Sequence, residues 1–172
     1  MSDFLIRPSI EDDLSEIARI YGHHVLHGSA TFELAPPGRD EMATRRSAIL
    51  ALGLPYLVAE HDGAVVGFAY ASPYRPRPAY RFTVEDSIYI DPQHVARGCG
   101  RVLLGALIDH CERGPWRQMI AVIGDSGNTA SIRLHRHFRF RVAGTLLAVG
   151  FKFDRWVDTV LMQRELGPRS RS

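Results

Sequence analysis

The stretch that most constrains the fold covers residues 83–104, where a strand-like segment passes through a glycine-bearing loop into a helix-like one. Apolar β-branched and polar residues alternate over 83–90, which predicts a strand with two different faces. Asp91-Pro92 ends the strand, because proline has no backbone N–H to donate. From Val102 onward, apolar residues recur at helical spacing. A strand, a short polar loop and an amphipathic helix therefore follow one another.

The loop between strand and helix carries Gly98 and Gly100. A helix start has unpaired backbone N–H groups and the positive end of the helix dipole, so it can bind an anion. The same glycines also suit a tight strand-to-helix bend, and the residues alone leave both interpretations open. The loop lacks the G-K-[ST] of a nucleotide P-loop and the third glycine of the dinucleotide fingerprint. If it binds an anion, a pyrophosphate is the expected one.

Two residues are candidates for proton transfer. Glu85 lies in the middle of the predicted strand, on the same side as Ser87 and Tyr89. It is either a glutamate on a solvated face or a partly buried carboxylate, and burial would raise its pKa toward that of a general base. His135 follows the polar turn at Asn128 and lies on the helix predicted over 129–138. Glu85 is thus the candidate base and His135 the candidate acid, with a surface histidine as the alternative.

A second constellation precedes the strand. Arg75 and Arg77 stand between prolines in residues 73–78, and Tyr80 follows. Guanidinium groups held in restricted geometry suit carboxylate or phosphonate groups, although an exposed basic loop has the same composition. The eight histidines show no HExxH or other strong ligand spacing, so no metal is predicted.

The remaining elements predict an α+β (mixed α/β) fold in one domain over residues 1–166, followed by a polar tail at 167–172. Asp62-Gly63 predicts a tight hairpin turn. A capping box at 9–12 is expected to start the first helix, and 31–33 to form a brief extended piece. Strands are expected at 4–7, 56–61, 64–70, 83–90, 119–123, 141–149 and 159–164, with 150–158 as a connection; helices are expected to reach Val25 and to cover 40–52 and 129–138.

Charge and cysteine usage exclude several classes of protein. The net charge is +2 with scattered basic residues, so no nucleic-acid partner is expected. No apolar run approaches membrane-spanning length, so no membrane association is expected. Cys99 and Cys111 fit neither a disulfide scaffold nor a zinc site, which favours a reducing, cytoplasmic setting.

Three runs of sequence resemble the GNAT superfamily of acetyl-CoA-dependent N-acetyltransferases, and within it the phosphinothricin and methionine sulfoximine/methionine sulfone acetyltransferases. They are AYASPYRPRPAYRFTVEDSIYIDPQHVARGCGRVLL, AVIGDSGNTASIRLHRHF and AGTLLAVGFKFDRWVDTVLMQREL, in the family's order and over nearly the whole chain. The resemblance implies a GNAT fold with a central, mostly antiparallel, twisted sheet flanked by helices. It also implies a homodimer.

The resemblance assigns roles to particular residues. Glu85 is implied as the base for the acceptor ammonium, acting directly or through water in a ternary complex, and His135 as lying near the thioester sulfur. A backbone donor on the opening strand is implied to stabilise the oxyanion. The implied acetyl-CoA contacts are Ile88, Tyr89, Ile90, Ala96, Arg97, Gly98, Cys99, Gly100, Arg101 and Asn128; the implied acceptor pocket is Phe32, Arg75, Arg77, Tyr80, Glu85 and Tyr89.

The chain departs from the family pattern at two informative positions. Val95 replaces the usual glutamine or arginine that opens the glycine signature, which removes one side-chain contact to CoA. Arg139 stands where a glycine commonly ends the helix beside the cofactor. The sequence therefore leaves two alternatives open: a GNAT acetyltransferase for another amine (a polyamine, an aminoglycoside or a protein N-terminus), or a CoA-binding module without catalysis.

Overall fold

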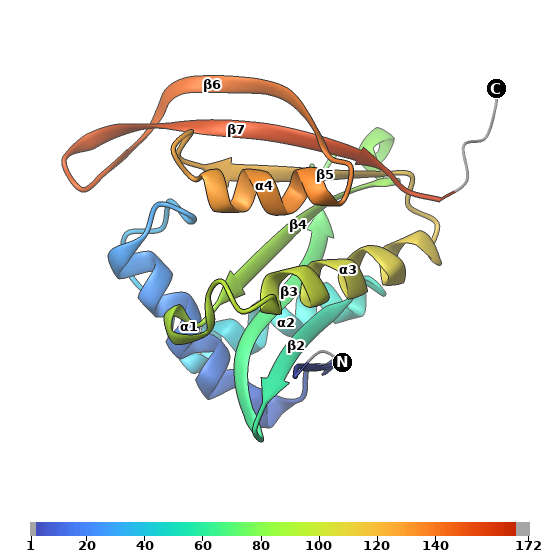
Figure 1. Ribbon diagram of the computed structural model, residues 1–172. Coiled ribbons are helices and arrows are strands. Elements are labelled where there is room, and N and C mark those ends of the chain that lie inside the picture. Colours follow the sequence, from blue (N-terminus) through green and yellow to red (C-terminus); the bar gives the residue numbers. More distant parts are fainter. Residues whose placement is uncertain (1–2, 168–172) are drawn as a thin grey trace.

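The computed structural model describes residues 3–167, so the predicted polar tail lies outside the described residues except for Gly167. Seven strands form one sheet in the order β1-β2-β3-β4-β5-β7-β6, in which only the β4–β5 pair is parallel (Figure 1). This mixed, mostly antiparallel sheet confirms the predicted fold class. The strands are β1 (Leu5–Pro8), β2 (Tyr56–His61), β3 (Ala64–Pro73), β4 (Thr83–Ile90), β5 (Gln118–Gly124), β6 (Arg141–Lys152) and β7 (Arg155–Glu165).

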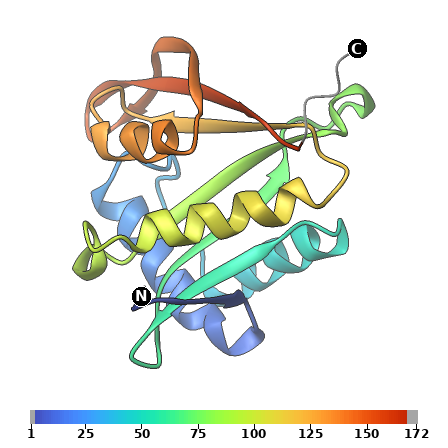
Figure 2. The same cartoon turned by 45° about the vertical axis from the view of Figure 1, so that its right-hand side comes forward.

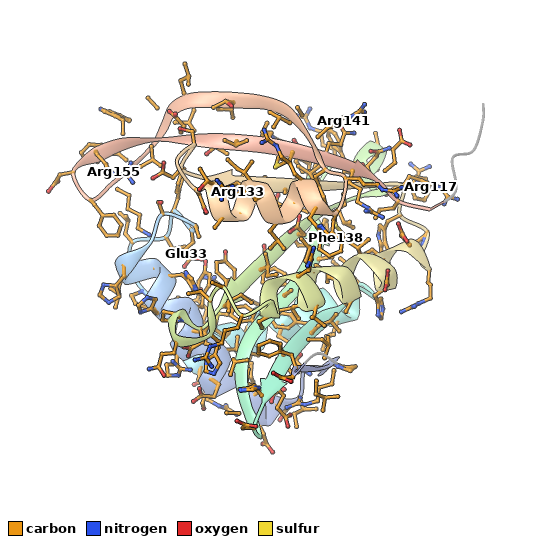
Figure 3. All side chains as sticks on the ribbon, viewed as in Figure 1. Glu33, Arg117, Arg133, Phe138, Arg141 and Arg155 are labelled. Carbon is orange, nitrogen blue, oxygen red and sulfur yellow. The ribbon has the colours of Figure 1, made fainter. Side chains whose placement is uncertain are left out.

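Helices cover both faces of the sheet. α1 (Leu14–His27) and α2 (Arg39–Ala51) lie on one face of β2–β4, and α3 (Cys99–Glu112) lies on the other (Figure 2). α4 (Thr129–His137) packs beside β5, and Phe138 after it packs against Gly105 of α3 (Figure 3). Buried leucines on one stripe of α3 join the core, and each contributes about 1.5–3 kcal/mol by leaving water.

The alternation along β4 sends its side chains to two environments. Tyr89 meets Tyr21 of α1 edge-on, with ring centroids 4.9 Å apart, so the odd-numbered side chains face α1 and α2. The Ile90 side chain instead packs over Gly67 of β3 and Gly100 of α3, so it lies on the α3 face of the sheet. Glu85 therefore shares the α1–α2 side with Ser87 and Tyr89, as the alternation predicts.

β4 and β5 pair over only part of their length. The parallel register joins Thr83–Asp86 to Gln118–Ala121, after which β4 continues to Ile90 and β5 to Gly124 without further pairing between them. The two strands therefore diverge and open a wedge in the sheet (Figure 1). The backbone edge of β4 beyond Asp86 has no ladder partner on the β5 side within the described part of the chain.

The structure corrects three local predictions. Residues 150–158 are not a connection: β6 runs to Lys152, β7 starts at Arg155, and a two-residue turn with φ of 54° and 55° joins them. Residues 31–33 form a loop instead of an extended strand. The first helical turn is capped not by Ser9 but by Asp13, whose carboxylate accepts from the N–H of Ile10, because Arg46 donates to the Ser9 hydroxyl.

Candidate active site

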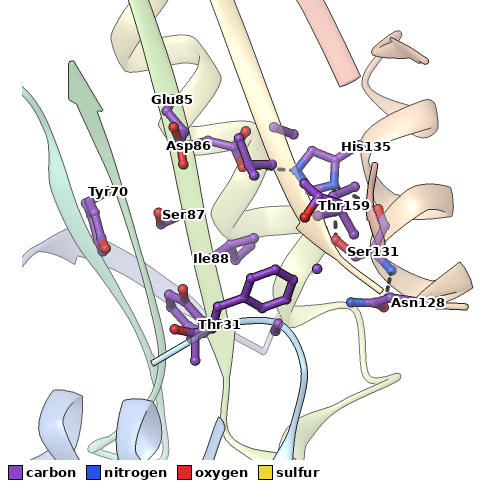
Figure 4. A pocket seen from close by; sticks show the side chains of 17 residues that line it. Thr31, Tyr70, Glu85, Asp86, Ser87, Ile88, Asn128, Ser131, His135 and Thr159 are labelled. Atoms are coloured by element: carbon purple, nitrogen blue, oxygen red, sulfur yellow. Dashed lines mark hydrogen bonds and ion pairs between the residues drawn. The ribbon is translucent and has the colours of Figure 1, made fainter. Parts of the chain in front are cut away.

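A cavity of about 310 Å³ lies where β4 and β5 diverge (Figure 4). β4 contributes residues 85–89, and β5 contributes its last four residues, 121–124. The remaining walls come from the loop after α1, from α4 and the residue before it, and from Tyr70 of β3 and Thr159 of β7. The wedge in the sheet therefore places a carboxylate, a histidine and an open strand edge around one space.

Glu85 is half-buried in the wall of this cavity. Burial, and then the negative charge of Asp86, raise its pKa to about 7, while the Arg75 guanidinium acts in the opposite direction. A carboxyl group with this pKa exchanges protons readily near neutral pH. Glu85 therefore lies where the sequence predicted it, with the protonation behaviour that a general base requires.

His135 lies in the same cavity and forms a buried pair with Asp86 (Figure 4). Its Nε2 is 2.9 Å from the Asp86 carboxylate, and both side chains are at most 2% exposed. Its Nδ1 donates to the Ser131 carbonyl at 2.8 Å, since a carbonyl can only accept. Burial lowers the pKa of His135, but the charge of Asp86 and the hydrogen bonds to Asp86 and Ser131 together outweigh it, so the net direction is upward. Both ring nitrogens are therefore engaged by the protein.

Asp86 is a site residue that the sequence analysis missed. One of its oxygens, Oδ1, has no hydrogen-bond partner among the described residues. The alternation of β4 gave a signal, because Asp86 is a charged residue at an inward position between Val84 and Ile88. Its partner His135 lies 49 residues away, however, and no sequence pattern joins the two.

The glycine loop precedes α3 as predicted and is open to solvent. Gly98 has φ of 89°, and a Cβ built on it would meet nothing within 4 Å. The side chains of residues 95–98 are exposed, whereas Cys99 is buried and can offer only its backbone. The first N–H groups of α3 have no intrahelical acceptors. This turn fits an anionic group such as a pyrophosphate.

The other predicted cofactor contacts fall into two groups. Ile88, Tyr89 and Asn128 line the cavity, and the Asn128 side-chain oxygen caps α4 by accepting from the N–H of Ser131. Ile90 does not line the cavity, and its carbonyl accepts from Nε2 of His24 at 2.8 Å. Arg101 is held by its guanidinium against His137 of α4 at 3.0 Å.

The predicted acceptor residues divide in the same way. Phe32, Glu85 and Tyr89 line the cavity. Arg75, Arg77 and Tyr80 do not, and they lie in the loop between β3 and β4. In that loop Arg75 stacks on the Tyr74 ring, 5.2 Å from its centroid. Arg75 lowers the pKa of Glu85, so this loop lies near the part of the cavity that Glu85 lines.

Within residues 3–167, no group of three or more His, Cys, Asp or Glu side chains could hold a metal ion. No helix in this range combines the length and the apolar character needed to cross a bilayer. Cys99 and Cys111 are free, buried thiols outside the cavity.

Comparison with known proteins agrees with this geometry. Residues 23–140 match the acetyltransferase (GNAT) family. The chain is 58% identical over 161 residues to a phosphinothricin N-acetyltransferase of Alcaligenes faecalis, covering 94% of this chain and 82% of that protein. It is 40% identical to an L-methionine sulfoximine/L-methionine sulfone acetyltransferase of Salmonella typhimurium, covering 94% of each.

A solved structure shows the same fold. It is a GNAT superfamily phosphinothricin acetyltransferase (Pat) from Sinorhizobium meliloti in complex with AcCoA, with a TM-score of 0.96, 46% identity and coverage of 100% of this chain and 92% of that one. These relatives confirm the predicted family, fold and acetyl donor. The chain belongs to the acetyltransferase (GNAT) family and is an acetyl-CoA-dependent N-acetyltransferase.

Proposed function

We propose that the protein acetylates the amino group of a small amino-acid-like substrate such as phosphinothricin, methionine sulfoximine or methionine sulfone. Similar proteins carry these names, which supports the acceptor class. The observation that carries the proposal is the half-buried Glu85 carboxyl, with a pKa of about 7, in the wall of the cavity between the diverging strands. A base of this strength matches proton removal from an ammonium group at neutral pH.

The donor fits the wedge. The exposed residues 96–98 and the N-terminus of α3 at Cys99 would hold the pyrophosphate of acetyl-CoA. The edge of β4 at Ile88 to Ile90, which has no strand partner on the β5 side, would follow the pantetheine arm through backbone N–H and C=O groups, apart from the Ile90 carbonyl that already accepts from His24. The amide NH₂ of Asn128 would add a donor, because its oxygen is already used by the helix cap. Acetyl-CoA supplies a thioester carbonyl that an amine can attack.

The chain's own groups prepare that attack. Glu85 takes a proton from the acceptor ammonium, directly or through one water, and so makes the amine a nucleophile. Backbone donors on the open edge of β4 would stabilise the oxyanion. Burial raises the pKa of Cys99 to about 11 and that of Cys111 to about 12, and neither lines the cavity. Direct transfer in a ternary complex is therefore favoured over an acetyl-cysteine intermediate.

We propose that His135 offers a hydrogen bond or a proton to the leaving sulfur. Its buried position beside Asp86 fixes the ring, and the contacts with Asp86 and Ser131 raise the pKa of His135. To transfer a proton, it would have to give up its contact with Asp86 or with Ser131. On the acceptor side, Phe32 and Tyr89 would form the wall. Arg75, Arg77 and Tyr80 would attract the acidic group at the mouth.

The test is acetyl-CoA-dependent thiol release with phosphinothricin, methionine sulfoximine and methionine sulfone, beside spermidine, an aminoglycoside and a peptide with a free N-terminus. We expect turnover of phosphinothricin, methionine sulfoximine and methionine sulfone. Glu85→Gln should lose about 100-fold or more in kcat, while its acetyl-CoA binding measured by calorimetry stays unchanged. Glu16→Gln, on the exposed face of α1, is the matched control and should keep full activity.

Three results would contradict the proposal. Equal turnover by Glu85→Gln would remove Glu85 from the mechanism. Preference for a cationic amine would favour the alternative acceptors. Tight acetyl-CoA binding without turnover of any amine would favour a CoA-binding module.

We also propose a homodimer in a reducing, cytoplasmic compartment. The two free cysteines support the compartment. Edge strand β6 and its turn into β7 support the dimer, because an exposed apolar edge usually marks an interface. The exposed apolar side chains there are Leu146, Leu147, Val149, Phe151, Phe153 and Trp156.

A further inference from the structure

Residues 29–33, here called the wall segment, cross the open end of the wedge between the two halves of the sheet. In Figure 1 this segment follows α1 and reaches toward the C-terminal strands. Thr31 and Phe32 line the cavity on the side that Tyr89 also faces, which is the proposed acceptor side. The wall segment has no strand or helix of its own, so side-chain contacts must hold it.

The N-terminal half of the molecule holds one side of the wall segment. The Tyr21 hydroxyl lies 2.9 Å from the Thr31 hydroxyl and donates to the Glu33 carboxylate at 2.8 Å. Arg45 of α2 donates to the same carboxylate at 2.6 Å. These contacts tie the segment to α1 and α2 (Glu33 is labelled in Figure 3).

The C-terminal half receives the other side in two glycine positions. A Cβ on Gly150 of β6 would lie 2.3 Å from the Phe32 ring. A Cβ on Gly124 of β5 would lie 2.0 Å from the Ser29 carbonyl oxygen. Only glycine at these positions allows the wall segment to approach β5 and β6 this closely.

Lys152 completes the attachment and is the only lysine in the chain. It lies at the end of β6, is 4% exposed, and its Nζ donates to the Thr31 carbonyl at 2.7 Å. Its other surroundings are the Phe153 ring, 5.1 Å from Nζ to the centroid, and the charge of Glu33. Burying an ammonium group is costly, and a purely structural contact at this strand end would not require one.

We propose that Lys152 is a positioning residue that fixes the Thr31–Phe32 wall across the wedge and thereby sets the affinity for the acceptor. This inference rests on the proposed function for the identity of the ligand. Without the Nζ–Thr31 bond, the C-terminal half holds the wall segment only by its packing on Gly124 and Gly150 and by a 3.2 Å bond from the Ser29 hydroxyl to the Asp125 carboxylate. The binding-competent arrangement then becomes a fraction of the population. The apparent acceptor affinity falls by that fraction, while the chemistry in the assembled site is unchanged.

The experiment compares Lys152→Met, Lys152→Arg and Gly150→Ala with the unmodified protein. The methionine keeps the length of the side chain and removes the donor, whereas the arginine restores a donor. In Lys152→Met we expect amide hydrogen exchange of residues 29–33 to accelerate about tenfold or more. We also expect the KM for phosphinothricin to rise about tenfold. Its kcat and its KM for acetyl-CoA should stay within about twofold.

Two comparisons separate positioning from loss of structure. Gln163→Met removes a side-chain bond of 2.8 Å to Gln118 in the same sheet, away from the cavity, and should leave both readouts unchanged. In a Phe32→Ala background, Lys152→Met should add less than about twofold to the acceptor KM, because the wall through which Lys152 acts is already lost. Gly150→Ala should reproduce the rise in acceptor KM, and Lys152→Arg should recover part of it.

Unchanged exchange of residues 29–33 in Lys152→Met would overturn the inference. So would faster exchange accompanied by a lower kcat and a rise in both KM values together, which indicates general destabilisation. If the unmodified protein acetylates no amine, the proposed function fails. The exchange comparison with Gln163→Met then decides by itself whether Lys152 holds the wall.

Discussion

Glu85 and Asp86 are neighbours on β4 whose side chains leave the strand on opposite faces. Asp86 pairs with His135, whereas Glu85 faces the cavity, where the Arg75 guanidinium of the exposed loop lowers its pKa. The negative charge of Asp86 acts on Glu85 in the opposite direction and raises its pKa. In this dipeptide one carboxyl group is held by a histidine, and the other can exchange a proton near neutral pH.

We predict that kcat/KM for phosphinothricin rises with pH and levels off, with a midpoint near 7. The sign follows from the deprotonated base being the active form, because a raised pKa moves the rise to higher pH. Arg75→Gln should move the midpoint upward, since Arg75 lowers the pKa of Glu85. High salt should reduce that difference, because Arg75 is exposed.

The control for this profile is Arg81→Gln, which removes a guanidinium from the same loop. Arg81 stacks on Phe82. The groups that shift the pKa of Glu85 are Asp86 and Arg75, and Arg81 does not belong to them. Its midpoint should equal that of the unmodified protein. A flat profile between pH 6 and 8 would show that Glu85 is not the titrating base.

At the scale of elements, the end of α4 carries a local conflict between residue and conformation. Arg139 follows the helix and has φ of 63°, in the left-handed region that favours glycine. Its side chain is exposed. A non-glycine residue in this region costs about 1–2 kcal/mol. The backbone at Arg139 is therefore strained.

Arg139→Gly should therefore stabilise the protein by about 1 kcal/mol, partly offset by the greater freedom of glycine in the unfolded chain. The melting temperature measured by calorimetry should rise by roughly 2–4 °C. Arg136→Gly, an exposed position inside the same helix, should do the opposite and cost about 1 kcal/mol. A fall in melting temperature for Arg139→Gly would show that the arginine side chain contributes more than its backbone costs.

Elements with local turn signals could be predicted from the sequence. Asp62-Gly63 has the composition of a tight turn, and the β2–β3 hairpin forms there. The β6–β7 hairpin turns at Phe153 and Asp154, which both adopt positive φ without a glycine. Nothing in that dipeptide indicates a turn, so the preceding and following residues were predicted as a connection. The tertiary packing of the hairpin overrides the local preference there.

The site could be predicted only where one segment contains the signal. Glu85 and the Gly98–Gly100 loop belong to a single strand-to-helix stretch. Lys152 and Asp86 were missed, because their partners Thr31 and His135 come from distant parts of the chain. Such pairs depend on the sheet order, which periodicity does not determine.

At the scale of the whole molecule, the β6 edge leaves large apolar side chains in water. Leu147 is 74% exposed and Trp156 is 66% exposed, with Phe151 in edge contact with Trp156 at 5.1 Å. We predict that Leu147→Asp converts the proposed homodimer to a monomer in light scattering, because the charge would be buried in the interface. Leu52→Asp, 60% exposed at the end of α2, is the control and should keep the mass of the unmodified protein. A monomeric mass for the unmodified protein would contradict the dimer.

The short parallel seam between β4 and β5 also bears on the order of folding. The hairpins β2–β3 and β6–β7 close through two-residue turns, so each forms from neighbouring residues. Thr83 can pair with Gln118 only after the loop that contains α3 has closed, and such closure is slow because it costs entropy before it is rewarded. We therefore expect the two halves to acquire their secondary structure first and the seam to join last. Far-ultraviolet circular dichroism would then recover before enzymatic activity during refolding, since the cavity exists only once the halves meet.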